Sequence, residues 1–273
     1  MCIFNGPGAT GEDHAVELGL CTNQADLASV AAAGYDYLER ATAMGLKVGA
    51  AESEWAPVRA AILAAALPTP VCNLFFPNDL KLVGPQRDLA RTLDYVDQAL
   101  TRIVEIGAAI QVFGSGRART VPEGYPPQKA LDELAELCAA IAPLAERRGV
   151  IVAMEHLRPA ECNLLTTLAE TADFVRRVNH PAVRLLADGY HMAQVNEPYT
   201  VIRSCADLLV HVHLADPATR NEPSFAGSDL RPLFRELKAA GYDGRLSLEC
   251  AWKDMPNTLA ATHDLVVAQW AES

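Results

Sequence analysis

Short apolar or β-branched runs alternate along the chain with longer segments rich in Ala, Leu, Glu and Arg. The short runs predict buried strands, and the longer segments predict helices because their apolar residues recur at helical spacing. Segment 85–105 shows this spacing clearly, and we expect two further helices at 129–148 and 164–178. The predicted strands lie near 16–21, 35–39, 70–75, 109–113, 150–155, 183–188, 208–214 and 245–249.

Eight strands that alternate with helices predict a parallel sheet joined by right-handed crossovers. The chain has 273 residues, which suits a (β/α)8 TIM barrel of about 250 residues. We therefore expect one α/β barrel domain over residues 1–273. The alternative is an open, doubly wound sheet, but no Gly-x-Gly-x-x-Gly follows the first predicted strand.

Composition and charge narrow the possible partners. The formal net charge of −11 argues against a nucleic-acid partner, because phosphate binding needs a basic face. The longest apolar stretches, such as 60–67, are far shorter than the roughly 20 residues that span a bilayer. Residues 1–11 lack the pattern of a secretory signal, and the seven cysteines form no Cys-x-x-Cys. We expect a cytoplasmic protein with no membrane partner that acts on a small molecule, and we leave open whether it forms a homo-oligomer.

Four consecutive predicted strands end in or near a side chain that binds metals. Glu155, Asp188 and Glu249 end the fifth, sixth and eighth strands, and His213 lies near the end of the seventh. One acid after a strand is often only a helix cap, but four such residues would meet at the carboxyl face of a barrel. The sequence therefore predicts one divalent ion, Mn²⁺ ahead of Mg²⁺ or Co²⁺, with Zn²⁺ less favoured.

Three further polar residues lie on or beside these predicted strands. His211 shares a strand face with His213, because side chains alternate with period two, and we expect it to pack behind the ligand. His156 points away from Glu155, which indicates a structural role. Glu39 ends the second predicted strand, where it either reaches the substrate or lies on the surface.

The second half of the chain resembles the sugar isomerase and epimerase barrels of the xylose isomerase-like superfamily, which include ketose 3-epimerases and hydroxypyruvate isomerases. The resemblance is carried by four motifs, which are Glu155-His-Leu-Arg-Pro-Ala-Glu161, Leu185-Leu-Ala-Asp-Gly-Tyr-His191, His211-Val-His-Leu-Ala-Asp216 and Ser247-Leu-Glu249. It implies metal ligation by Glu155, Asp188, His213 and Glu249.

The resemblance also implies substrate contacts at Glu161, His191 and Arg220. The chain departs from the ketose 3-epimerases at three places, one of which is that Pro223-Ser-Phe-Ala-Gly lacks the expected Pro-Gly. Arg220 follows His213 by seven residues, as in hydroxypyruvate isomerases, and Leu-Arg-Pro replaces Leu-Asn-Arg after His156. These departures leave the substrate open among ketoses, inososes and hydroxy-keto acids.

A carboxylate pair suits proton transfer next to a carbonyl, with the metal stabilising the resulting enediolate. Glu155 and Glu249 come from strands five and eight, so they can act as acid and base on opposite faces of a substrate. Proton return to the same carbon gives epimerisation, and return to the neighbouring carbon gives isomerisation. Arg220 would orient substrate oxygens, and His191 would donate to a developing oxyanion.

Other functions remain as alternatives. A metal-dependent lyase that eliminates from an oxidised glycoside would begin with the same proton abstraction. A phosphodiester hydrolase would need more His ligands and a basic face, and a non-catalytic sugar-binding barrel would not need the full ligand set. The run 114–119 is either a glycine-rich turn or a phosphate cradle. Four aromatic residues either line the pocket or belong to the core: Phe75, Phe76, Tyr190 and Trp252.

Overall fold

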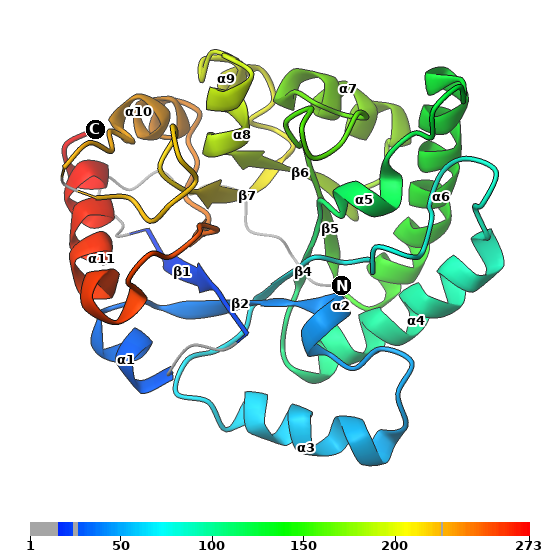
Figure 1. Ribbon diagram of the computed structural model, residues 1–273, viewed down its shortest axis with the longest axis horizontal. Helices are drawn as coiled ribbons and strands as arrows, with labels where there is room; N and C mark the ends of the chain where they lie inside the picture. The colour runs from blue at the N-terminus through cyan, green and yellow to red at the C-terminus, as the bar shows by residue number, and fades with distance from the viewer. Residues whose placement is uncertain (1–15, 24–26, 225) are drawn as a thin grey trace.

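The computed structural model describes residues 16–23, 27–224 and 226–273. Their parallel strands close into a barrel in chain order, and helices surround it (Figure 1). The prediction of a (β/α)8 TIM barrel is confirmed. The strands are β1 Leu18–Cys21, β2 Tyr37–Ala41, β3 Val71–Asn73, β4 Ile110–Phe113, β5 Ile151–Glu155, β6 Val183–Asp188, β7 Leu209–Leu214 and β8 Leu246–Leu248.

The longer helices form most of the outer ring, and caps rather than apolar spacing fix where two of them begin. The Asp88 side chain accepts a hydrogen bond from Arg91 N at 3.0 Å, so α4 begins after it and not at 85. Thr167 caps α7 in the same way. The longer helices are α3 Glu52–Leu63, α4 Leu89–Glu105, α6 Pro127–Arg147, α7 Leu168–Val178, α10 Arg231–Ala239 and α11 Met255–Ala271.

Shorter helices lie between the strands. They are α1 Leu27–Ala32, α2 Thr42–Gly45, α5 Gly116–Arg119, α8 Gly189–Gln194 and α9 Val201–Ser204. Of these, α2 and α8 directly follow the ends of β2 and β6. The run 114–119 thus contains a turn into α5. No helix in the described part of the chain combines the length and apolar character needed to cross a membrane.

Strand β2 lies two residues later than the sequence indicated, and this shift changes the position of Glu39. Tyr35 is buried outside the barrel, where its hydroxyl donates to Leu259 O of α11. Tyr37 begins the strand and points inward, so Glu39 points inward as well. Glu39 is completely buried, and the surface alternative for it was wrong.

The part of the barrel interior that lies away from the carboxyl ends of the strands is apolar. Tyr37, Val71, Val112, Ala153 and Leu186 form a buried cluster there. The Tyr37 hydroxyl reaches past β1 and donates to Leu246 O of β8 at 2.8 Å, and a Cβ at position 19 would lie 2.1 Å from the Tyr37 ring. Gly19 therefore makes room for this ring. The packed layer separates the carboxyl end of the barrel from its opposite mouth.

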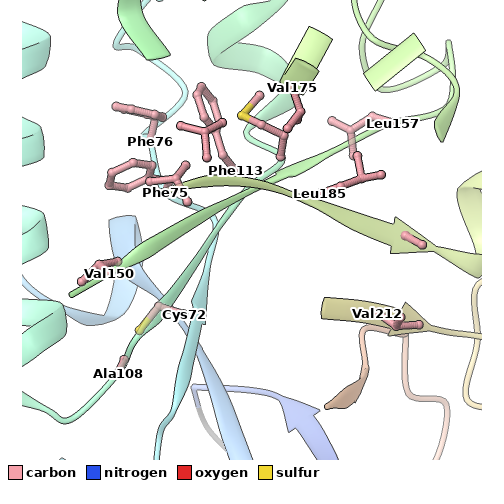
Figure 2. Packing of buried hydrophobic residues seen from close by; sticks show 14 of the residues in the cluster. Cys72, Phe75, Phe76, Ala108, Phe113, Val150, Leu157, Val175, Leu185 and Val212 are labelled. Carbon is pink, nitrogen blue, oxygen red and sulfur yellow. The ribbon is translucent and has the colours of Figure 1, made fainter. Parts of the chain in front are cut away.

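A second apolar layer lies between the strands and the helices. Figure 2 shows Phe75, Phe76 and Phe113 beside one another in this layer. The ring centroids of Phe76 and Phe113 are 4.9 Å apart, and those of Phe75 and Phe113 are 6.0 Å apart. Burial of such a side chain stabilises the fold by roughly 1.5–3 kcal/mol. The layer holds the segments after β3 and β4 at the rim of the site.

Candidate metal centre and active site

Four side chains meet at the carboxyl face of the barrel. Glu155 and Asp188 end β5 and β6, His213 lies on β7, and Glu249 follows β8. His213 Nδ1 lies 3.3 Å from Glu155 Oε1, 3.9 Å from Asp188 Oδ2 and 3.6 Å from Glu249 Oε2. Because their ligand atoms all lie within 4.8 Å of one another, one ion could contact all four. The structure thus brings together the four residues that the sequence singled out.

Glu39 orients the imidazole of this cluster. Its carboxylate contacts His213 Nε2 and His211 Nε2, each at 2.8 Å, and all three side chains are fully buried. With Nε2–H donated to Glu39, the Nδ1 of His213 faces the other three carboxylates. A carboxylate behind a metal-binding histidine fixes the orientation and tautomer of its ring. His211 packs behind His213, where the strand pattern placed it.

The charge balance of the cluster favours a cation at its centre. Burial opposes a charged His213, but Glu39 and Glu249 raise its pKa well above 6.5. Burial also opposes ionisation of Glu39, but the two imidazoles hold its pKa well below the ordinary value. A proton on His213 Nδ1 would therefore supply positive charge among the carboxylates. Three carboxylates and one imidazole fit a divalent ion that prefers oxygen ligands.

The two glutamates of the cluster have opposite pKa shifts. Burial raises the pKa of Glu155, and the nearby charge of Glu249 raises it further. Burial would also raise the pKa of Glu249, but His213 and then Arg220 lower it to about 2. Two carboxyl groups whose pKa values are driven apart are suited to the roles of acid and base.

A glycine and a buried arginine position Glu155. A Cβ at position 114 would lie 2.1 Å from Glu155 Oε2, so Gly114 leaves space for the carboxylate. The buried guanidinium of Arg119 donates to Glu155 O at 2.6 Å and to Phe113 O at 3.5 Å. The phosphate-cradle alternative for 114–119 needed Arg119 as a ligand, and these contacts instead give it a structural role.

A charged network covers one side of the cluster. Arg220 Nη1 donates to both carboxylate oxygens of Glu161, at 2.7 and 2.8 Å, and Nη2 donates to Glu249 Oε2 at 3.0 Å. Arg158 Nε donates to Glu161 Oε1 at 2.7 Å. Both guanidinium groups lie over the Tyr190 ring, 5.2 and 5.3 Å from its centroid. Arg220 and Glu161 therefore lie beside the cluster, as expected, and the sequence had not assigned Arg158 to this network.

His191 lies behind Asp188. Its backbone N–H donates to Asp188 Oδ1 at 2.8 Å, and its Nδ1 accepts from Arg158 N at 3.3 Å. Its Nε2 has no hydrogen-bond partner among the residues that the structure describes. His156 is also fully buried, and burial followed by repulsion from His191 lowers its pKa to about 3. His156 is thus a neutral residue of the interior.

A cavity of about 540 Å³ lies next to this network and includes Glu161 in its wall. Phe76 lines the cavity, Tyr190 supports the two arginines, and Phe75 belongs to the core. Trp252 packs against the core and is partly buried. A larger cavity of about 700 Å³ opens at the opposite mouth of the barrel, away from the ligand cluster. Further lining residues of the first cavity are Met44, Leu74, Ser115, Arg117 and Leu157.

Residues 27–267 match the model of the xylose isomerase-like TIM barrel family. The chain belongs to this family. The match extends the resemblance seen in the second half of the sequence to nearly the whole barrel.

Among curated relatives, 3-dehydro-D-guloside 4-epimerase of Escherichia coli (strain K12) is 30% identical over 107 residues, which are 39% of this chain and 40% of that protein. Ketose 3-epimerase of Arthrobacter globiformis is 28% identical over 120 residues, which are 42% of this chain and 41% of that protein. The chain therefore matches about two fifths of the length of these relatives.

Solved structures resemble the barrel over most of its length. The 3-keto-D-glucoside 4-epimerase from E. coli has a TM-score of 0.75 at 21% identity, over 92% of this chain and 98% of that chain. The D-allulose 3-epimerase from Methylomonas sp., in complex with D-allulose, has a TM-score of 0.77 at 18% identity. This match covers 93% of this chain and 97% of that chain. At these identities the similarity shows a shared fold.

Proposed function

We propose that the protein is a metal-dependent sugar epimerase or isomerase. The observation that carries this proposal is the pair of carboxylates, Glu155 and Glu249, which flank His213 Nδ1 at 3.3 and 3.6 Å. They come from the ends of β5 and β8 and have pKa shifts of opposite direction. The curated relatives described above are epimerases of ketoses and oxidised glycosides, which supports the same reaction class.

The metal would be held by Glu155, Asp188, His213 and Glu249. The mostly oxygen donor set favours Mn²⁺, with Mg²⁺, Co²⁺ and Zn²⁺ as alternatives. A divalent ion there would polarise the carbonyl and the neighbouring hydroxyl of a sugar and stabilise negative charge on them. Asp188 also caps α8, so this ligand is held by the backbone N–H of His191.

Glu249, which its lowered pKa keeps ionised, would take the proton next to the carbonyl. Glu155, with its raised pKa, is the better acid and returns a proton from the other side. Return to the same carbon inverts it, and return to the adjacent carbon moves the carbonyl. The roles exchange in the reverse reaction.

Arg220 and Glu161 would bind substrate hydroxyls and orient the sugar. Arg220 already contacts Glu249 and Glu161, so a sugar oxygen that replaces one of these contacts would lie beside the base. His191 has an imidazole nitrogen without a hydrogen-bond partner among the described residues, and that nitrogen would donate to substrate oxygen. The substrates that fit are ketoses, inososes and hydroxy-keto acids.

Product analysis tests this proposal against the lyase alternative. The Mn²⁺-loaded protein is incubated with a panel of ketoses, inososes and keto-glycosides, and the products are identified by NMR. An epimerised or isomerised sugar of unchanged mass supports the proposal. A released fragment with an unsaturated sugar supports the lyase, which begins with the same proton abstraction.

Glu249→Gln provides the matched variant. Loss of the carboxylate removes both a base and a charged ligand, so turnover and metal content should fall together. Glu54→Gln, on the exposed face of α3, is the control and should keep both. Full metal content and full activity in Glu249→Gln would contradict the assignment.

A further inference from the structure

A thiol lies beside the proposed metal centre. Cys21 ends β1, and it pairs in register with Glu39 of β2. On the other side, Leu20 pairs with Leu248 of β8, so the next residues along these strands are Cys21 and Glu249. Because side chains alternate along a strand, Cys21 faces the barrel interior on the same side as Glu39. Cys21 is half-buried at this position.

Cys21 forms a second ligand cluster that overlaps the first. Ligand atoms of Cys21, His213 and Glu249 all lie within 4.8 Å of one another. Glu155 and Asp188 belong only to the first cluster, together with the same His213 and Glu249. Two alternative ion positions therefore share one imidazole and one carboxylate. An ion at either position would draw on the same imidazole and the same carboxylate, so the two ions would compete.

The two positions differ in chemical character. The position with Glu155 and Asp188 offers three carboxylates, which suit Mn²⁺ and Mg²⁺. The position with Cys21 offers one sulfur, one nitrogen and one oxygen. Three such protein ligands plus one water are typical of tetrahedral Zn²⁺ sites, and Cd²⁺ is still more favoured by sulfur.

We propose that Cys21, His213 and Glu249 form a separate site for soft divalent cations, occupied by Cd²⁺ or Zn²⁺ in competition with the ion of the four-ligand centre. The inference rests on the metal centre of the proposed function. Binding forms a sulfur–metal bond, and the thiol proton is released to solvent. Glu249 then ligates the soft ion and is withdrawn from proton transfer, so the protein would be inhibited by these ions.

Cadmium titration tests this site directly, without a substrate. A thiolate that binds Cd²⁺ gives a charge-transfer band in the ultraviolet, and Mn²⁺ released into solution is detected by electron paramagnetic resonance. In the Mn²⁺-loaded protein, added Cd²⁺ should produce the band and release Mn²⁺ in equal amounts. Cys21→Ser should abolish the band. It should also weaken Cd²⁺ binding by at least roughly 10- to 100-fold, because losses of this size are typical even when the mutated residue only contacts a metal ligand.

The matched control is Cys250→Ser. Cys250 is also half-buried and directly follows Glu249, but it packs against the core and belongs to no ligand cluster in the described chain. This variant should keep the band, and Cys21→Ser should keep the Mn²⁺ affinity of the wild type. Cys21→Ala removes the thiol without adding a hydroxyl and should behave as Cys21→Ser does.

The outcomes separate this inference from the proposed function. A band that persists in both Cys21 variants, or that is lost in Cys250→Ser, would overturn the soft-cation site. Mn²⁺ binding without any cadmium band in the wild type would also overturn it, while the four-ligand centre would stand. A wild-type protein that binds neither ion would overturn the metal centre itself and this site with it.

Discussion

Glu39 affects the proposed metal centre through the two histidines that it contacts. Its carboxylate joins His211 and His213 at 2.8 Å each in a fully buried position. Its contact with Nε2 leaves Nδ1 of His213 facing the centre. A protonated Nε2 on the Glu39 side leaves Nδ1 as the donor to a metal. Glu39 is therefore a positioning residue for the proposed ligand set.

Glu39→Gln should weaken metal binding without removing a ligand. The amide keeps the shape of the side chain but loses the charge that holds Nε2–H of His213. We expect a loss of roughly 10- to 100-fold in Mn²⁺ affinity, as is usual for such outer partners. Isothermal titration with Mn²⁺ measures this loss, and Glu54→Gln serves as the exposed control. Unchanged affinity in Glu39→Gln would show that His213 needs no such support.

At the scale of elements, hydrogen bonds to the carboxylate of Glu105 join α3 to α4. The indole N–H of Trp55 donates to Glu105 Oε2 at 2.5 Å, and Arg59 Nη1 donates to the same oxygen at 3.0 Å. The Arg102 guanidinium lies over the Trp55 ring, 5.1 Å from its centroid. Partial burial opposes ionisation, but the hydrogen bonds from Trp55 and Arg59 lower the pKa of Glu105. The ionised form of Glu105 therefore stabilises the fold.

Glu105→Gln should reduce the free energy of unfolding by about 1 kcal/mol at pH 7, because this hydrogen bond is only partly shielded from solvent. A lowered pKa in the folded state stabilises the protein above the unfolded pKa of about 4.3. The difference from wild type should thus be constant at neutral pH and vanish as the pH falls through the folded pKa. Urea unfolding at a series of pH values measures it.

The control for this prediction is Glu52→Gln. Glu52 pairs with Arg59 at 2.7 Å but is largely exposed, so its removal should leave stability nearly unchanged. A Glu105→Gln variant as stable as wild type, or a difference that grows as the pH falls, would contradict the prediction.

The elements could be predicted well from the sequence, but their ends could not. The strand 183–188 was predicted as observed, because its apolar residues stop at an acid that also caps the next helix. The β2 strand was misplaced by two residues, because Tyr35 and Tyr37 look alike in sequence. They differ in their contacts, because Tyr35 packs on α11 and Tyr37 reaches β8 inside the barrel. That misplacement also hid the role of Glu39.

The residues of the candidate site could be predicted where they end strands. Glu155, Asp188, His213 and Glu249 follow from the strand pattern because parallel strands of a barrel all end at one face. Arg158 and Cys21 could not be assigned in this way. The contacts of Arg158 depend on the path of the loop after β5, and those of Cys21 depend on the register of β1 with its neighbours. The residue pattern within one segment predicts neither the path of that loop nor the register between strands.

At the scale of the whole molecule, the proposed ion would connect β5, β6, β7 and β8. The carboxylates of this cluster repel one another, and a divalent ion would reverse that repulsion. Ligand binding to the folded state alone stabilises it in proportion to the logarithm of ligand concentration. The barrel should therefore be more stable with metal than without it.

Mn²⁺ at a hundred times its dissociation constant should stabilise the fold by about 2.7 kcal/mol. For a protein of this size, that corresponds to a rise in melting temperature of roughly 5–10 °C. Differential scanning calorimetry with and without chelator measures the rise. Asp188→Asn should reduce it, because one charged ligand is lost. A melting temperature that is independent of Mn²⁺ would argue against a resident ion.

Proton exchange in heavy water tests the central claim most directly. Product formation by the Mn²⁺-loaded protein should place deuterium on the carbon next to the carbonyl without fragmentation of the sugar. Product identity is measured alongside, since internal proton return would leave the product unlabelled. In Glu249→Gln and Glu155→Gln, loaded with excess Mn²⁺ to offset their weaker metal binding, exchange on one face should continue while product formation is lost. The account would be contradicted if no ketose, inosose or keto-glycoside takes up deuterium, forms a new sugar or releases a fragment.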